Sequence, residues 1–374
     1  MKILHFADLH LDIPFATSRM PVSVAQDCRR RLRQTLHRIL DFAIERKVDV
    51  ITVGGDLFEA DRVSRDTLNF ITTAFQQLAP LPILISPGNH DYYYPSSPYA
   101  RIKWPDNVHI FKDSTLQPCC LNDEIAIWGV AHTAPAERKN LIQDFTVPQD
   151  GRVHLLLLHG SEMSSDTQTH SAHAPFKLQH VQEAGFAFAM LGHYHGARIL
   201  EMNRPVAVYP GSPQPLNFNQ NQQHSLALIT VHPDYIECEC IPTATQAFLT
   251  VPHSLDDAKT TDDVGEALLD KVAGKASEAN FLRVILSGLQ NHDLQLDVAY
   301  LKQFLMQHFD FVEIANSTHS SYELSAIAKE PTLRGDFTRK LQHALAEAGD
   351  DRALIRRALQ YGLEAFDGEK KIGT

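Results

Sequence analysis

Five apolar stretches of the sequence end in, or are followed by, side chains that can bind a metal ion. Glycines beside several of them would let neighbouring loops approach closely. Because the loops after the carboxyl ends of parallel strands meet in one crevice, these separated motifs are expected to form a single cluster. The motifs are Asp8-Leu9-His10, Gly54-Gly55-Asp56, Gly88-Asn89-His90-Asp91, Leu158-His159-Gly160 and Gly192-His193-Tyr194-His195.

The chemistry of this set is that of a mixed nitrogen and oxygen metal centre. It contains three carboxylates, one amide and five imidazoles, and no cysteine. Such ligands suit Mn²⁺, Fe²⁺ or Zn²⁺, whereas a Mg²⁺ site would use mainly oxygen. Seven candidate ligands exceed what one ion uses. Two ions about 3.5–4 Å apart are a recurring device for phosphoester hydrolysis, so the residues predict a two-metal phosphoesterase.

Each motif taken alone also has a structural interpretation. Asp-x-His and Gly-Asn-His-Asp occur as capping or turn elements, because Asn and Asp favour turns. A single histidine after four leucines, such as His159, is typical of a core or edge position. Gly-His-x-His is more specific, since His193 and His195 project to the same side of an extended segment. The ordered set as a whole, and no single motif, indicates a functional cluster.

Strand-like and helical patterns position these motifs. The helical pattern is clearest over residues 29–47, where apolar residues form one stripe. Continuous apolar runs indicate strands buried on both faces. These runs cover residues 2–7, 50–53, 83–85, 125–130, 153–158 and 186–191. The alternation of strands with helices predicts a layered α/β fold, an α+β sandwich.

The pattern changes after Gly192 to successive short strands separated by turn residues, and the first domain is expected to close near Pro242. A mixture of strand-like and helical segments follows, and two amphipathic helices are expected over residues 332–366. We therefore predict a catalytic domain at 1–242, a smaller α+β capping domain at 243–316 and a C-terminal helical, partner-binding segment at 317–374.

Composition excludes several classes of protein. The 374 residues are 44% hydrophobic and 21% charged, with a formal net charge of -11, which is typical of a soluble globular protein. No apolar stretch approaches the ~20 residues of a membrane helix, and the first residues lack a signal-peptide pattern. Five cysteines without C-x-x-C spacing favour a reducing compartment, so we expect a cytoplasmic protein. The acidic charge argues against unselective polyanion binding, although bound metal ions would offset part of it.

The ordered series D-x-H, GGD, GNHD, H and GHxH over residues 8–195 resembles the calcineurin-like metallophosphoesterase superfamily. Within it, the segments ILHFADLHLD, GGDLFEAD and YPGSPQPL are similar to SbcD-type DNA repair exonucleases, including the shorter YhaO-like bacterial members. The resemblance implies a four-layer metallophosphoesterase domain with two divalent ions, which we expect to be manganese. It further implies a DNA exonuclease or endonuclease that uses in-line attack of metal-bound hydroxide on phosphate.

The match of motifs implies a role for each site residue. His90 would contact the phosphate and assist the leaving oxygen. Seven ligands are implied, three for one ion, three for the other and one that bridges them: Asp8, His10 and His195; Asn89, His159 and His193; and Asp56.

The chain departs from the SbcD-type pattern at Glu59, where many of these enzymes carry histidine. The protein phosphatases of the superfamily carry an acid there that hydrogen-bonds the catalytic histidine. Glu59 is therefore expected to contact His90 and to orient its ring for catalysis. The alternative is that Glu59 is a solvated acid of a turn.

Expectations about substrate and partners come from the loop after His90 and from the resemblance. Tyr92, Tyr93, Arg101 and Lys103 are candidates to stack on bases and hold phosphates, although aromatic residues also pack long loops onto a domain. The C-terminal helices are expected to bind a coiled-coil ATPase of the SbcC type, and a homodimer is a further expectation. Two alternatives stay open: a hydrolase of small phosphoesters such as cyclic nucleotides, and a non-catalytic scaffold.

Overall fold

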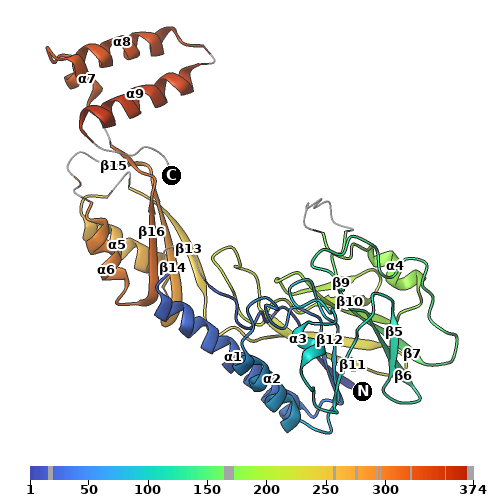
Figure 1. The fold of residues 1–374 in the computed structure, drawn as a ribbon. Helices are drawn as coiled ribbons and strands as arrows, with labels where there is room; N and C mark the ends of the chain where they lie inside the picture. Colours follow the sequence, from blue (N-terminus) through green and yellow to red (C-terminus); the bar gives the residue numbers. More distant parts are fainter. Residues whose placement is uncertain are drawn as a thin grey trace. The chain divides into compact units, whose positions relative to one another are not determined.

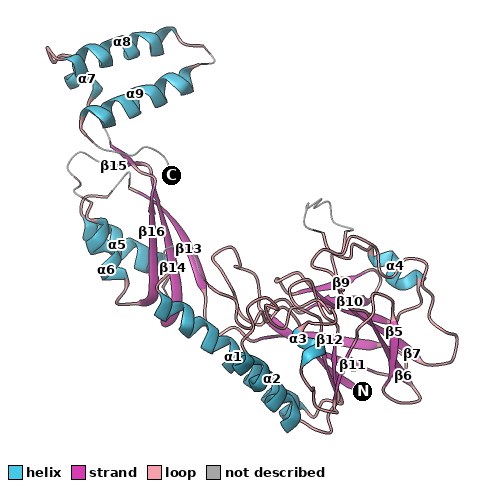
Figure 2. Cartoon of the chain, viewed as in Figure 1, coloured by secondary structure: helices cyan, strands magenta, loops and turns pink. Residues whose placement is uncertain are grey.

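The chain forms two compact units, Met1–Phe248 (unit 1) and Leu249–Thr374 (unit 2). A computed structural model describes residues 1–15, 20–163, 172–255, 258–273, 277–290, 294, 296–320, 322–349 and 351–368. The fold is α/β, with several sheets and a group of C-terminal helices (Figures 1 and 2). The predicted segment 317–374 therefore extends beyond the described residues at its end.

The first sheet of unit 1 positions the N-terminal motifs. Its strand order is β12-β11-β1-β2-β3-β4, in which β1 to β4 run parallel and β11 and β12 are antiparallel. Every residue of β2 and β3 is buried, which explains their continuous apolar sequence. The strands are β1 (Lys2–Phe6), β2 (Val50–Val53), β3 (Ile83–Ile85), β4 (Val108–Ile110), β11 (Ser225–Val231) and β12 (Ile236–Pro242).

The second sheet of unit 1 positions the histidine motifs. Its order is β5-β6-β7-β8-β10-β9, with β6, β7, β8 and β10 parallel and the two edge strands antiparallel. Ile3 and Leu84 of the first sheet share one hydrophobic cluster with Leu155 and Phe188 of the second. The strands are β5 (Gln117–Cys120), β6 (Ile125–Gly129), β7 (Val153–His159), β8 (Phe188–Gly192), β9 (Arg198–Glu201) and β10 (Pro205–Tyr209).

Helices complete unit 1. In α1 (Val22–Arg46), buried Leu32, Leu36 and Leu40 recur every four residues, which gives the helix one apolar face. Arg33 of α1 pairs with Asp66 of α2 at 2.6 Å, so the two helices lie side by side (Figure 1). The other helices are α2 (Arg65–Gln77), α3 (Pro98–Arg101) and α4 (Leu178–Glu183). No helix in the described part of the chain combines the length and apolarity needed to cross a membrane.

Unit 2 contains a small sheet, two helices beside it and a helical hairpin. Leu268, Leu301 and Val312 belong to the hydrophobic cluster between this sheet and its helices. A separate cluster around Leu359 and Leu363 joins the hairpin helices. The elements are β13 (Phe248–Ser254), α5 (Thr261–Lys271), β14 (Ser277–Ser287), β15 (Leu289–Gln290), α6 (Val298–Leu305), β16 (Phe309–Asn316), β17 (His319–Ser320), α7 (Leu324–Ile327), α8 (Leu333–Glu347) and α9 (Arg352–Phe366).

The compact units divide the chain after Phe248, at the start of β13, whereas the sequence places a domain boundary at 242, the end of β12. The predicted parts 243–316 and 317–374 fall almost entirely within unit 2. Their separation into a capping domain and a partner-binding segment stays a prediction.

Candidate metal centre

The seven predicted ligands come from the carboxyl ends of five parallel strands. Hydrogen bonds join the strand ends of the two sheets, and two of them show this most directly. The backbone N–H of His193, after β8, donates to the Asp8 carboxylate after β1 at 3.0 Å. The ring of His159, the last residue of β7, contacts the carbonyl oxygen of Gly54 after β2 at 2.8 Å. The motifs therefore meet in one cluster, as the sequence predicts.

The backbone at this cluster is strained. Asp8, His10, Asp56 and His193 have positive φ angles of 55°, 50°, 51° and 107°, a region that residues with a Cβ rarely adopt. Gly88 allows the close approach of a neighbouring loop, since a Cβ there would lie 2.3 Å from an Asp56 carboxylate oxygen. Such strained conformations persist at functional sites, where the surrounding structure fixes them.

The buried Asp91 carboxylate fixes the two loops that carry this strain. It accepts backbone N–H groups of Asp56 at 3.0 Å, Leu57 at 2.8 Å and Gly88 at 2.6 Å, and the Tyr99 hydroxyl at 2.7 Å. These four hydrogen bonds join it to the loops after β2 and β3 and to α3. Asp91 supports the ligand loops and is not placed as a ligand.

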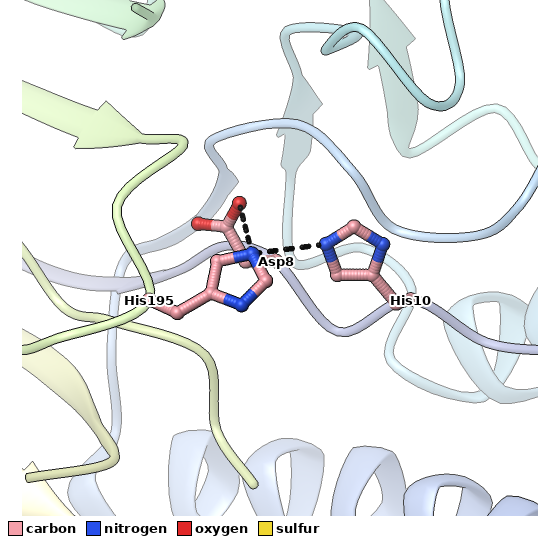
Figure 3. A group of neighbouring side chains, drawn as sticks. All are labelled: Asp8, His10 and His195. Atoms are coloured by element: carbon pink, nitrogen blue, oxygen red, sulfur yellow. Dashed lines mark hydrogen bonds and ion pairs between the residues drawn. The ribbon is translucent and has the colours of Figure 1, made fainter. Parts of the chain in front are cut away.

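The first group of ligand atoms consists of Asp8, His10 and His195, shown in Figure 3. The Nε2 atoms of the two histidines are 3.2 Å apart, and Asp8 Oδ1 lies 3.7 Å from His195 Nε2. His10 directs its Nδ1 atom to the Glu59 carboxylate at 2.7 Å. In the neutral ring the Nε2 atom is then the unprotonated one and offers a lone pair to a cation, although, against the effect of burial, the Glu59 hydrogen bond and the nearby carboxylates raise the pKa of His10.

The second group of ligand atoms surrounds His159. Because its Nδ1–H donates to the Gly54 carbonyl, its Nε2 atom carries a lone pair. This Nε2 faces Asn89 Oδ1 at 3.0 Å and Asp56 Oδ2 at 3.4 Å. Three acceptor atoms thus face one another with no hydrogen between them. A divalent cation satisfies such an arrangement, so these residues fit a metal ion.

His193 is not part of a compact group of ligand atoms. Within the described residues, three groups of acids and histidines offer ligand atoms that all lie within 4.8 Å of one another, and His193 belongs to none of them. Its ring centroid lies 5.2 Å from that of His159. The groups are Asp8 with His10 and His195, His10 with Asp56 and His90, and Asp8 with Asp56 and His159.

Burial sets the charge of the ligands. Burial, and then the nearby Asp56, raise the pKa of Asp8 to about 8. Burial also lowers the pKa of His159 well below its ordinary value and that of His193 and His195 to about 3. These three rings are therefore neutral, the form that binds metals. Among the described residues, neither Asp8 nor Asp56 has a lysine or arginine partner, so a bound cation would offset their charge.

Glu59 contacts two histidines at once. One carboxylate oxygen accepts from His10 Nδ1 at 2.7 Å and the other from His90 Nδ1 at 2.9 Å. Burial would raise the pKa of Glu59, but these two hydrogen bonds hold it at about 2. The hydrogen bond to Glu59 raises the pKa of His90 to about 9. The predicted contact between Glu59 and His90 is confirmed, and the contact with His10 is an addition.

Sequence reasoning missed three side chains of this centre. The Gln220 amide N–H donates to His195 Nδ1, although residues 217–223 have the composition of a plain polar turn. The rings of His132 and His173 have centroids 5.3 Å from those of His159 and His193, respectively. His132 follows β6 by three residues, so the same strand-end rule could have identified it.

The four predicted nucleic-acid contacts do not line one common cavity among those described for residues 60–118. Tyr92 stacks on Tyr94, with ring centroids 5.0 Å apart. Tyr93, Lys103 and Arg101 line three different cavities. Their role in binding DNA stays a prediction.

Comparisons with known proteins agree with this geometry. The calcineurin-like phosphoesterase family matches residues 1–205. The uncharacterized metallophosphoesterase YhaO of Bacillus subtilis is 27% identical over 238 residues, which cover 62% of this chain and 57% of YhaO. The DNA double-strand break repair protein Mre11 of Saccharolobus solfataricus is 25% identical over 227 residues, which cover 57% of this chain and 54% of Mre11.

The matches thus span little more than half the length of these two relatives. Among solved structures, one from Thermus thermophilus has a TM-score of 0.41 and 14% identity, and the match covers 64% of this chain and 98% of that chain.

Proposed function

Because the chain belongs to the calcineurin-like phosphoesterase family, we propose that it is a phosphodiesterase with two divalent metal ions that cleaves DNA. The observation that carries the proposal is the pair of adjacent groups of candidate ligands, Asp8 with His10 and His195, and Asp56 with Asn89 and His159. The similarity to Mre11, a DNA double-strand break repair protein by name, supports DNA as the substrate.

Some residues of the site would bind the metal ions, and others would transfer a proton. The first site would use Asp8, His10 and His195, and the second Asn89, His159 and His193, with Asp56 between them; we expect Mn²⁺ because both sets mix nitrogen and oxygen. When bound, two such ions would stabilise charge on the phosphate oxygens and lower the pKa of a water molecule.

We infer that His90 acts as the acid. Its Nδ1–H donates to Glu59, so its Nε2–H points elsewhere and remains available to a substrate. The side chain is 46% exposed, whereas those of Asp8 and His10 are buried. With a pKa of about 9, the ring holds its proton at neutral pH and can give it to the departing oxygen of the phosphodiester.

The test is hydrolysis by the full chain with Mn²⁺, using labelled single-stranded DNA, double-stranded DNA and a cyclic nucleotide as substrates. We expect cleavage of DNA, and its loss by at least about a thousandfold in Asp56→Ala. Asp61→Ala, an exposed acid of the same loop, is the matched control and should keep full activity. Cleavage of the cyclic nucleotide alone would favour a small-phosphoester hydrolase. Bound Mn²⁺ without hydrolysis of any substrate would favour a scaffold.

A further inference from the structure

A cavity of about 760 Å³ lies beside the candidate metal centre in unit 1. It is bounded by the start of α2, by the loop before α3 and by α3 itself. One of its lining residues, Ala60, donates its backbone N–H to the carbonyl oxygen of His90 at 3.0 Å. The cavity therefore begins one residue from Glu59 and shares a wall with the loop that carries His90.

Two arginines give this cavity its charge. Arg65 is the first residue of α2 and Arg101 the last residue of α3, so they come from two different walls. Both side chains are exposed, and neither has a hydrogen-bond or ion-pair partner in the described part of the chain. The lining residues that the structure describes include no acid. Two unpaired guanidinium groups without an opposing carboxylate favour a phosphate-bearing ligand.

The rest of the lining is apolar and aromatic. Leu68 is 8% exposed and Ile102 lies next to Arg101. The Tyr94 ring is held by stacking on Tyr92, at 5.0 Å between centroids and 30° between planes. A fixed aromatic ring beside aliphatic side chains is a surface on which a nucleobase can stack, whatever its identity.

We propose that this cavity binds one nucleotide of a polynucleotide strand, with its phosphate between Arg65 and Arg101 and its base against Tyr94. Its volume falls within the range of about 300–1,000 Å³ that is usual for ligand sites. The position of that nucleotide next to the bond to be cleaved rests on the proposed function, whereas binding itself does not. A free nucleotide offers the same phosphate and base, so the experiment compares the binding of an oligonucleotide with that of a free nucleotide.

Binding is measured with metal-free protein that contains residues 1–374, by the fluorescence anisotropy of a labelled oligothymidylate. Arg65→Ala and Arg101→Ala should each weaken binding about tenfold, the usual loss for one charge-assisted contact. Each should also lower the salt dependence of log Kd by roughly 0.7, the value for one phosphate contact with a single strand. Arg46→Ala, at an exposed arginine of α1 outside this cavity, is the matched control. Thymidine monophosphate should compete in the wild-type protein and lose that ability in the double variant.

Measurements of hydrolysis distinguish a defect in this cavity from a defect at the metal centre. The ratio of kcat/KM for the oligonucleotide to that for bis(4-nitrophenyl) phosphate should fall about tenfold for each arginine replaced, because the small diester has no neighbouring nucleotide to bind in the cavity. If the wild-type protein hydrolyses neither substrate, the proposed function fails, while the loss of oligonucleotide binding would still support the cavity.

Two results would overturn the inference. The first is an oligonucleotide affinity that is the same in the wild-type protein and in the Arg65→Ala, Arg101→Ala double variant. The second is a change of oligomeric state in that variant, measured by size-exclusion chromatography with light scattering. It would assign the cavity to a contact between copies of this chain.

Discussion

Replacing Glu59 by Gln should weaken the first metal site and slow hydrolysis, because one carboxylate holds both His10 and His90. The two oxygens accept hydrogen bonds of 2.7 Å and 2.9 Å from these rings. Glutamine has the same size but offers only one oxygen and no charge. At most one of the two histidines can then keep its acceptor, and the other ring loses its orientation.

The size of the effect follows from where Glu59 lies. Its side chain is only 16% exposed, so solvent screens these hydrogen bonds little. Loss of the partner of a ligand histidine typically lowers metal affinity by about 10- to 100-fold. Loss of a positioned acid costs roughly a hundredfold or more in kcat. The second site should keep its affinity, since His159 is held by the Gly54 carbonyl instead.

Calorimetric titration of the metal-stripped protein with Mn²⁺ measures each site, and kcat is then measured at saturating Mn²⁺. We expect one weakened site, one unchanged site and a kcat that excess metal does not restore. Asp61→Asn, an exposed acid two residues away, is the control. Full recovery of kcat at saturating Mn²⁺ would refute the role of Glu59 at His90, and unchanged affinity at both sites would refute its role at His10.

Three further predictions concern other residues. Gln220→Glu should tighten Mn²⁺ binding, measured by calorimetry, roughly tenfold. The present amide donates to His195 Nδ1, whereas a carboxylate would accept from Nδ1 and leave the lone pair of Nε2 for the ion. Weaker binding would contradict this. Burial lowers the pKa of His5 to about 4, below its value of about 6.5 in the unfolded chain. The folded state then binds fewer protons, so His5 alone should contribute about 2 kcal/mol to the fall in the urea-measured free energy of unfolding from pH 7 to pH 5, and the fall in His5→Gln should be smaller by that amount. A chain ending at Asn316 lacks α8 and α9 with exposed Leu333 and should not retain a coiled-coil ATPase in a pull-down, whereas equal retention would exclude these helices as the docking site.

The positions of the buried strands, and therefore of the site residues at their ends, could be predicted from the sequence. Apolar runs such as 153–158 lie in parallel strands because only a strand covered on both faces can be apolar throughout. The sheet order could not be predicted, since β10 lies between β8 and β9 although it follows β9 in the chain. Nothing in the local sequence specifies such a crossover, which depends on packing between distant strands.

Side-chain orientation at the centre was less predictable than its composition. The spacing of His193 and His195 predicts that both project to one side, yet the positive φ of His193 turns that segment away from a regular strand. Gln220 lies in a segment without apolar periodicity, and only the folded loop brings it to His195. Contacts between loops depend on backbone conformations that periodicity does not encode.

The strain and the buried charge of this centre have a common explanation. Asp8 and Asp56 are 0% and 2% exposed, and both have positive φ angles, so each carries an electrostatic and a conformational cost. Two apolar sheets packed against each other supply the burial that offsets this cost, and Asp91 holds the loops with four hydrogen bonds. A ligand set held in this way does not have to rearrange to receive cations. The same rigidity makes the positions of His10 and His90 depend on the one carboxylate, Glu59, that both of them contact.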